Sequence, residues 1–201
     1  MDARDLLLEE HAAVHSAAVG GNKASMAERT FGGLTDDHMR VRPREDLNSL
    51  AWLMWHIARA EDIMANLVVN GRDQVFDDGW RSRLKIARKD FGIGMTKPEV
   101  AELSTTIDIA ALRDYRDAVG RRTRDIVGAY GPKDWEGEVD ARAAERAGSL
   151  GCFGDRTEAL VKAFAGRPRR AVLSGITIMH SAMHMGEGAT VRTAGGFGTG
   201  I

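Results

Sequence analysis

Four segments of the chain carry apolar residues every three or four positions, and the alternating patterns typical of β-strands are scarce. This spacing places the apolar side chains on one face of an α-helix, which must then pack against another element. The sequence therefore predicts an all-α protein built as a four-helix bundle. The predicted helices run from Asp2 to Val19, from Asn48 or Ser49 to Leu67, from Asp108 to Tyr130 and from Arg170 to Thr193.

The breaks between these helices are rich in glycine, asparagine and proline: Gly20-Gly21-Asn22, Asn70-Gly71 and Gly131-Pro132. A shorter helix is predicted from Ser25 to Phe31. Between about 132 and 169 the pattern weakens, and only Asp155 to Phe164 has helical spacing there. We expect a long, partly irregular connection before the last helix. The glycine-rich tail, 194–201, is expected to be loose.

Length and composition indicate a single globular domain. A chain of 201 residues, 43% of them hydrophobic, can bury one substantial core, so residues 1–201 are interpreted as one domain. The formal net charge of -1 favours neither nucleic acid nor an anionic membrane as a partner. The N-terminus lacks the apolar stretch of a signal peptide, and no apolar run is long enough to span a bilayer. We therefore expect a cytoplasmic protein.

Cys152 is the only cysteine, which excludes an internal disulfide and a multi-cysteine zinc site. It lies in a glycine-rich segment with no neighbouring His or Lys to lower the pKa of its thiol. An ordinary thiol is therefore favoured over a nucleophile or a fourth metal ligand. Any metal ion must be held by histidines and carboxylates.

Polar side chains fall on the face of the last helix that should point inward. At about 100° per residue, one narrow arc holds His180, His184 and Glu187 together with Leu173, Ile176 and Val191. On the second predicted helix, His56 lies at the flank of the buried face, from which it can reach a neighbouring helix.

Two imidazoles from one helix and a third from another can bind a divalent ion and leave coordination positions open for water and substrate. The spacing of His180 and His184 alone does not decide this, because His11 and His15 repeat it. The alternative is that these side chains are hydrogen-bonded histidines of the core.

Two segments of the chain resemble motifs of the DinB-like family of metal-binding four-helix bundles. The segment from Asn48 to Asp62, NSLAWLMWHIARAED, is similar to the family's second-helix motif. His180-x3-His184-x-Gly186, with Arg192 beyond it, is similar to the last-helix motif. The order, one histidine on the second helix and a pair on the fourth, matches the three-histidine metal site of that family.

The resemblance implies an up-down-down-up bundle, frequent homodimerisation and a small-molecule substrate. It also implies a divalent ion, zinc first and nickel or iron as alternatives, held by His56, His180 and His184. Family members with known activity include transferases and isomerases that use a low-molecular-weight thiol such as mycothiol or bacillithiol.

Glu187 and His11 are the candidates for handling protons. Glu187 could be a fourth ligand, a general base or a partner that orients an imidazole, and an ion pair with a nearby arginine is the alternative. His11 lies at the centre of the apolar face of the first helix, where it could line the site or be a core histidine. His15 and His38 are expected to face solvent or lie in a loop. Glu61 is expected to form a structural pair.

The sequence thus predicts a metal-dependent enzyme that activates a thiol or water for attack on a small electrophile. Because Cys152 is unsuited to this, the thiol would come from outside the protein. Ser181 follows His180 where zinc peptidases carry their general base, so a peptidase of that type is excluded. The alternatives are a hydrolase that needs no thiol, a non-catalytic metal-binding or stress-response module, and a structural dimer with core histidines.

Overall fold

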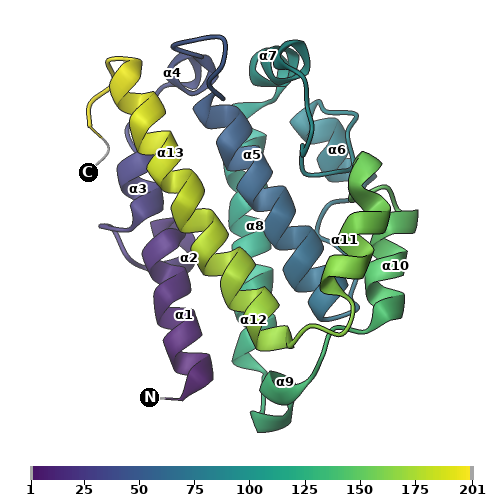
Figure 1. Ribbon diagram of the computed structural model, residues 1–201. Coiled ribbons are helices and arrows are strands. Elements are labelled where there is room, and N and C mark those ends of the chain that lie inside the picture. The colour runs from purple at the N-terminus through teal and green to yellow at the C-terminus, as the bar shows by residue number, and fades with distance from the viewer. Residues whose placement is uncertain (1, 200–201) are drawn as a thin grey trace.

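The computed structural model describes residues 2–199, which form helices and loops with no strand among them. The bundle consists of α1 (Ala3–Val14), α5 (Leu50–Glu61) continued by η1 (Asp62–Val69), α8 (Ile109–Gly128), and α12 (Arg169–Leu173) continued by η3 (Ser174–His180) and α13 (Ser181–Ala194). In Figure 1, α1 and the α12 to α13 element run upwards, whereas α5 and α8 run downwards. The all-α prediction is confirmed.

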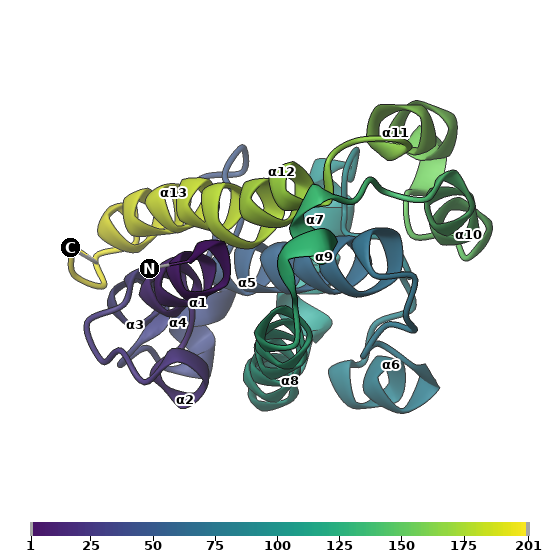
Figure 2. The same ribbon diagram turned by 90° about the horizontal axis from the view of Figure 1, so that it is seen from below.

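Shorter helices connect and cover the bundle. In chain order they are α2 (Ala17–Gly20), α3 (Met26–Phe31), α4 (Asp36–Arg40), α6 (Asp78–Leu84), α7 (Lys97–Thr106), α9 (Pro132–Glu136), α10 (Ala141–Ser149), η2 (Gly154–Arg156) and α11 (Thr157–Phe164). Figure 2 shows α10 and α11 at the side of the bundle that lies away from α1. Within residues 2–199, no helix has the length and apolar character needed to cross a membrane.

Side-chain caps fix the starts of the two central helices. Ser49 Oγ accepts a hydrogen bond from the Trp52 N–H at 3.0 Å, and the Asp108 carboxylate accepts one from the Ala111 N–H at 3.0 Å. Each cap satisfies a backbone donor that has no partner within its own helix, which is worth about 1 kcal/mol. The predicted starts of these helices are confirmed.

The first predicted helix is interrupted. α1 ends at Val14 instead of Val19, because the backbone of His15 is extended (φ -110°, ψ 169°). The Ser16 N–H donates to His15 Nδ1 at 2.9 Å, and a new helix, α2, starts at Ala17. The apolar spacing continues across this break, so periodicity alone does not reveal it.

The structure is more helical than predicted between the long elements. α6 and α7 were not predicted, and the connection 132–169 contains α9 and α10 besides the predicted helical segment. α10, with the sequence ARAAERAGS, has no large apolar side chain, and its buried positions are the alanines Ala144 and Ala147.

The glycine-rich tail is held in place as far as it is described. The Phe197 ring stacks on the His38 ring with centroids 4.4 Å apart. Arg192 Nε donates to the Phe197 carbonyl at 3.0 Å. The expected looseness of 194–201 stays a prediction, and residues 200–201 lie outside the described residues.

α5 and η1 form the centre of the molecule, with every residue buried. A helix that is buried all round is expected to be apolar all round. This one instead carries five buried polar or charged residues: His56, Arg59, Glu61, Asp62 and Asn66. Buried polar groups need hydrogen-bond partners, and here those partners bring distant segments to the helix.

Asp62 is the centre of the largest of these networks. Its carboxylate accepts hydrogen bonds from Arg59 Nη1 (3.3 Å) and the Tyr115 hydroxyl (2.7 Å). Further donors are Asn66 Nδ2 and the backbone N–H groups of Val75 and Phe76, at 2.6, 2.8 and 2.9 Å. These bonds attach the loop after η1 to the central helix.

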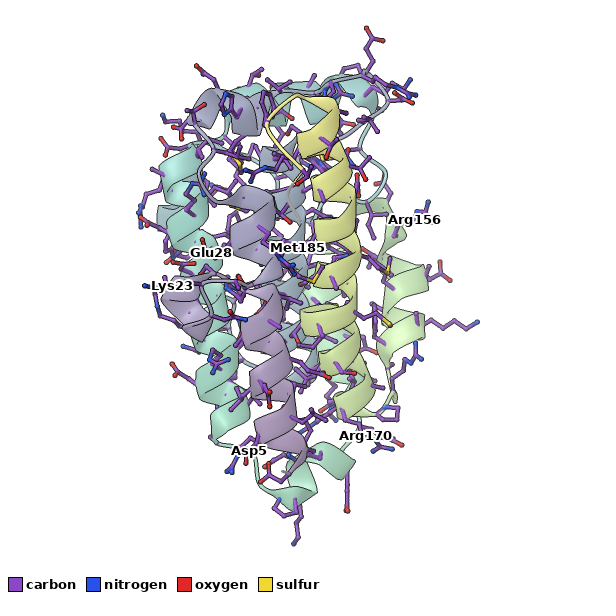
Figure 3. The ribbon with its side chains drawn as sticks, turned by 90° about the vertical axis from the view of Figure 1, so that its left-hand side faces the viewer. Asp5, Lys23, Glu28, Arg156, Arg170 and Met185 are labelled. Carbon is purple, nitrogen blue, oxygen red and sulfur yellow. The ribbon has the colours of Figure 1, made fainter. Side chains whose placement is uncertain are left out.

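The buried side of the last helix differs from the predicted one. Leu173 and Val191 are buried as predicted, and the other buried positions are Val172, Thr177, Ser181, Met185 and Gly188, with the histidines half-buried beside them. Figure 3 shows Met185 between α13 and the N-terminal helices. The helical wheel misplaces the face because η3 is π-helical, and its i→i+5 hydrogen bonds give more residues per turn than an α-helix.

Candidate metal centre

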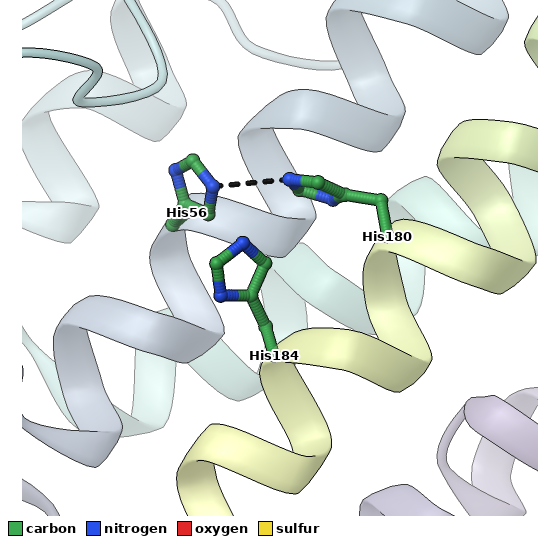
Figure 4. A group of neighbouring side chains, drawn as sticks. All are labelled: His56, His180 and His184. Carbon is green, nitrogen blue, oxygen red and sulfur yellow. Dashed lines mark hydrogen bonds between the residues drawn. The ribbon is translucent and has the colours of Figure 1, made fainter.

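His56, His180 and His184 come together between α5 and the last helix (Figure 4). His56 Nε2 lies 3.1 Å from His180 Nε2. The His184 ring centroid lies 4.6 Å from the centroid of each of the other two rings. One ligand atom from each residue falls within 4.8 Å of the others, which is the convergence that a single ion requires.

Hydrogen bonds fix the proton of two of these rings on the nitrogen that faces away from the centre. His56 Nδ1 donates to the Phe91 carbonyl at 2.5 Å, and His184 Nδ1 donates to Glu187 Oε2 at 2.9 Å. A carbonyl or a carboxylate can only accept, so Nδ1 carries the hydrogen. Nε2 therefore keeps its lone pair and is free to bind a metal ion.

The imidazoles are in the form that binds metal. Burial lowers the pKa of His56 to about 4 and that of His180 to about 3. Both rings are therefore neutral at pH 7. Two neutral imidazoles, with the ring of His184 converging on them, fit a divalent ion such as zinc, nickel or iron.

An aromatic support fixes the His56 ring. The Trp52 ring stacks on it, with centroids 4.8 Å apart and an angle of 8° between the planes. Gly92 follows the residue whose carbonyl holds His56, and its φ is +88°. A Cβ atom at Gly92 would lie 2.6 Å from Trp55 Cζ3, so only glycine lets the segment with Phe91 approach this closely.

Glu187 serves as a hydrogen-bond acceptor in this arrangement. Its Oε2 accepts from His184, and its Oε1 accepts from Asn48 Nδ2 at 2.8 Å. The bond from His184 lowers the pKa of Glu187, so the group is a carboxylate at neutral pH. Because both oxygens are engaged, the contacts favour the orienting role among the predicted alternatives.

His11 belongs to a second, separate buried group. His11 Nε2 lies 3.0 Å from Glu61 Oε1, and His15 Nε2 lies 3.9 Å from Glu61 Oε2. The prediction that His15 faces solvent is wrong, because the extended backbone at this residue turns the ring into the core. There it takes the space beside Gly120, where a Cβ atom would lie 2.4 Å from His15 Nε2.

The protons in this second group are placed unfavourably for a metal ion. His15 Nδ1 accepts the Ser16 N–H, so in the neutral ring the proton lies on Nε2. Glu61 pairs with His11 Nε2, which places a proton on that nitrogen as well. Both rings thus direct N–H groups at the carboxylate, whereas in the first group His56 and His184 direct the lone pairs of Nε2 at the centre. His56, His180 and His184 are therefore the better candidate group for a metal ion.

The acid stability of the protein should depend on His15. Burial, followed by the charge of Arg116, lowers the pKa of His15 well below its usual value. Below about pH 6.5, His15 takes up a proton in the unfolded chain but not in the folded chain. Lowering the pH in this range therefore lowers the free energy of unfolding by up to about 1.4 kcal/mol for each pH unit. Urea unfolding at pH 5.5, 6.5 and 7.5 should give a shallower slope for His15→Asn, whose amide oxygen can still accept the Ser16 N–H. Equal slopes would contradict this assignment.

Cys152 and His38 lie in ordinary environments. Cys152 is buried and accepts a hydrogen bond from Gln74 Nε2 at 3.3 Å. Burial raises the pKa of its thiol, which favours the inert form. His38 lies in α4, half-buried against Phe197, and not in a loop.

Three features of the site have no signal in the histidine pattern. The Phe91 carbonyl is a backbone group, and the sequence marks Asn48 only as the start of the second predicted helix and of its motif. Gly92 could have been found only as an isolated glycine in a loop, a pattern that also occurs at many other glycines of the chain.

Comparisons with known proteins agree with this fold and these motifs. A profile of the DinB superfamily matches residues 23–187. The crystal structure of a conserved protein of locus from Enterococcus faecalis has a similar fold, with a TM-score of 0.66 over 96% of this chain and 97% of that chain. The two sequences are 18% identical, so this likeness shows the fold alone. No curated protein matches the chain. Since the profile covers most of the chain, the protein belongs to the DinB superfamily.

Proposed function

We propose that the protein is a metal-dependent enzyme that activates a low-molecular-weight thiol, or water, for attack on a small electrophile. The observation that carries this proposal is the convergence of three imidazoles, in which the Nε2 lone pairs of His56 and His184 are directed at the centre. The histidines would hold a divalent ion, with zinc the first candidate and nickel or iron the others. Such an ion, when bound, makes a thiol or water more acidic and therefore a better nucleophile at neutral pH.

Other residues of the chain orient the histidines. The Phe91 carbonyl and the Trp52 ring hold His56, and Glu187 holds His184. These contacts keep the imidazoles in one orientation before any ion binds, which reduces the cost of ordering them. No protein thiol is available, because Cys152 is buried and its thiol stays protonated. The thiol is therefore proposed to be exogenous.

The need for a thiol can be tested directly. Metal-loaded protein should convert a chloronitrobenzene compound or an epoxide only when mycothiol or bacillithiol is added. The rate should be lost in His184→Ala and kept in Cys152→Ser, the matched control for an external thiol. Chromatography of the product would show whether sulfur has been added. A rate independent of thiol would instead indicate a hydrolase, and no reaction with either nucleophile would favour a metal-binding module.

A further inference from the structure

Asn48 connects the start of the central helix with the last helix. It precedes Ser49, the cap of α5, and its Nδ2 donates to Glu187 Oε1 at 2.8 Å. The backbone here is well fixed, because Ser49 Oγ also lies 2.7 Å from Ser104 Oγ. Asn48 is thus a rigidly mounted donor facing a carboxylate that is 139 positions away in the chain.

Glu187 needs such a partner to stay where it is. Its side chain is 33% exposed and has several rotatable bonds. It lies one turn after His184, and its charge also acts on His56. A carboxylate this close to the metal ligands is itself a good ligand for zinc or iron. Within its own helix, only the hydrogen bond from His184 to Oε2 opposes a turn of the carboxylate toward the three imidazoles.

Each oxygen of the Glu187 carboxylate accepts a hydrogen bond from a different residue. One oxygen accepts from His184, and the other is held by an amide group that can only donate through its nitrogen. Loss of the Asn48 amide would free Oε1 and leave the side chain held at one oxygen only.

We propose that Asn48 is a positioning residue: it holds Glu187 as the hydrogen-bond partner of His184 and keeps this carboxylate from becoming a fourth metal ligand. A coordination position then stays open for a thiol or water. This inference rests on the proposed function, because it concerns the same metal centre.

Spectroscopy of the cobalt-loaded protein can test the role of Asn48 without any assay of turnover. Visible absorption of Co(II) reports the number and type of its ligands. Asn48→Leu has nearly the same shape but cannot donate, so Glu187 should join the ion and change the spectrum. In the E187A background the same substitution should have no effect, because the carboxylate is absent. This double-mutant cycle separates an action through Glu187 from a general disturbance.

The same cobalt-loaded samples can be tested for an open coordination position at the ion. Titration with 2-mercaptoethanol should produce a sulfur-to-Co(II) charge-transfer band in the wild type. In N48L the apparent affinity for this thiol should fall about tenfold, the lower end of the usual effect of outer-shell changes. N48L/E187A should have the same thiol affinity as E187A alone.

Controls separate folding from positioning. The melting temperature of each metal-free variant shows whether it is folded. Asn70→Leu removes an amide that donates to the Ala65 carbonyl at the end of η1, and it should leave the Co(II) spectrum unchanged.

The outcomes are distinguishable. An unchanged Co(II) spectrum in N48L, or a change that persists in the E187A background, would overturn the role of Asn48 while leaving the proposed function standing. A spectrum that changes as expected, without a thiol band in the wild type, would support the role of Asn48 and count against thiol activation. A wild-type protein that binds no Co(II) would overturn both.

Discussion

Purified wild-type protein should contain about one divalent ion per chain, and His184→Ala should reduce this to nearly none. The variant loses a ligand whose orientation is fixed by Glu187, and the two imidazoles that remain cannot hold an ion against solvent. His56→Ala should behave in the same way. Elemental analysis after gel filtration gives the metal content directly.

Two control variants make this measurement specific. His38→Ala removes a half-buried histidine that stacks on Phe197, and it should retain the ion. His11→Ala removes a member of the second buried group and should also retain it, although with lower stability. If His11→Ala lost the ion and His184→Ala kept it, the assignment of the metal centre would be reversed. If the wild type carried none after loading with zinc, nickel and iron, the structural interpretation of the histidines would stand instead.

The grouping of the candidate ligands could be predicted from the sequence, because helical geometry places the histidine pair and the family motifs add His56 to it. An i, i+4 pair lies on one face of any helix, and the segment from Asn48 to Asp62 is long enough and regular enough to be recognised. The prediction of His56, His180 and His184 as one group agrees with the structure. Of the two alternatives for His11, the structure agrees with the core histidine, because the ring is buried and pairs with Glu61 apart from that group.

The rest of the site depends on information that periodicity does not contain. His15 is buried because the backbone is extended at one residue, and that break carries no apolar signal. The Phe91 carbonyl reaches His56 through a loop that was not predicted to approach the bundle. The histidines of the last helix lie beside the buried face because η3 is π-helical, which a wheel of constant angle cannot represent.

The buried network of the central helix also supports the metal centre. Arg59 Nη2 donates to the Lys89 carbonyl at 2.5 Å, two residues before Phe91. The carbonyl of Phe91 in turn accepts from His56. The segment that orients this ligand is therefore attached to α5 at two points, and Asp62 compensates the charge of the arginine that makes one of them. Stability and metal binding are coupled through these bonds.

Asp62→Ala should consequently destabilise the protein by about 3 to 5 kcal/mol, the usual cost of removing one partner of a buried ion pair. Arg59 is fully buried and would keep its charge without a counterion, and the donors of Tyr115 and Asn66 would lose their acceptor. Urea denaturation of metal-free protein, followed by circular dichroism, measures the loss. Asp114→Ala breaks an exposed pair with Arg83 and should leave the midpoint close to that of the wild type. A loss for Asp62→Ala no larger than for this control would mean that water or another side chain replaces the carboxylate. In that case the segment around Phe91 would not depend on the buried network.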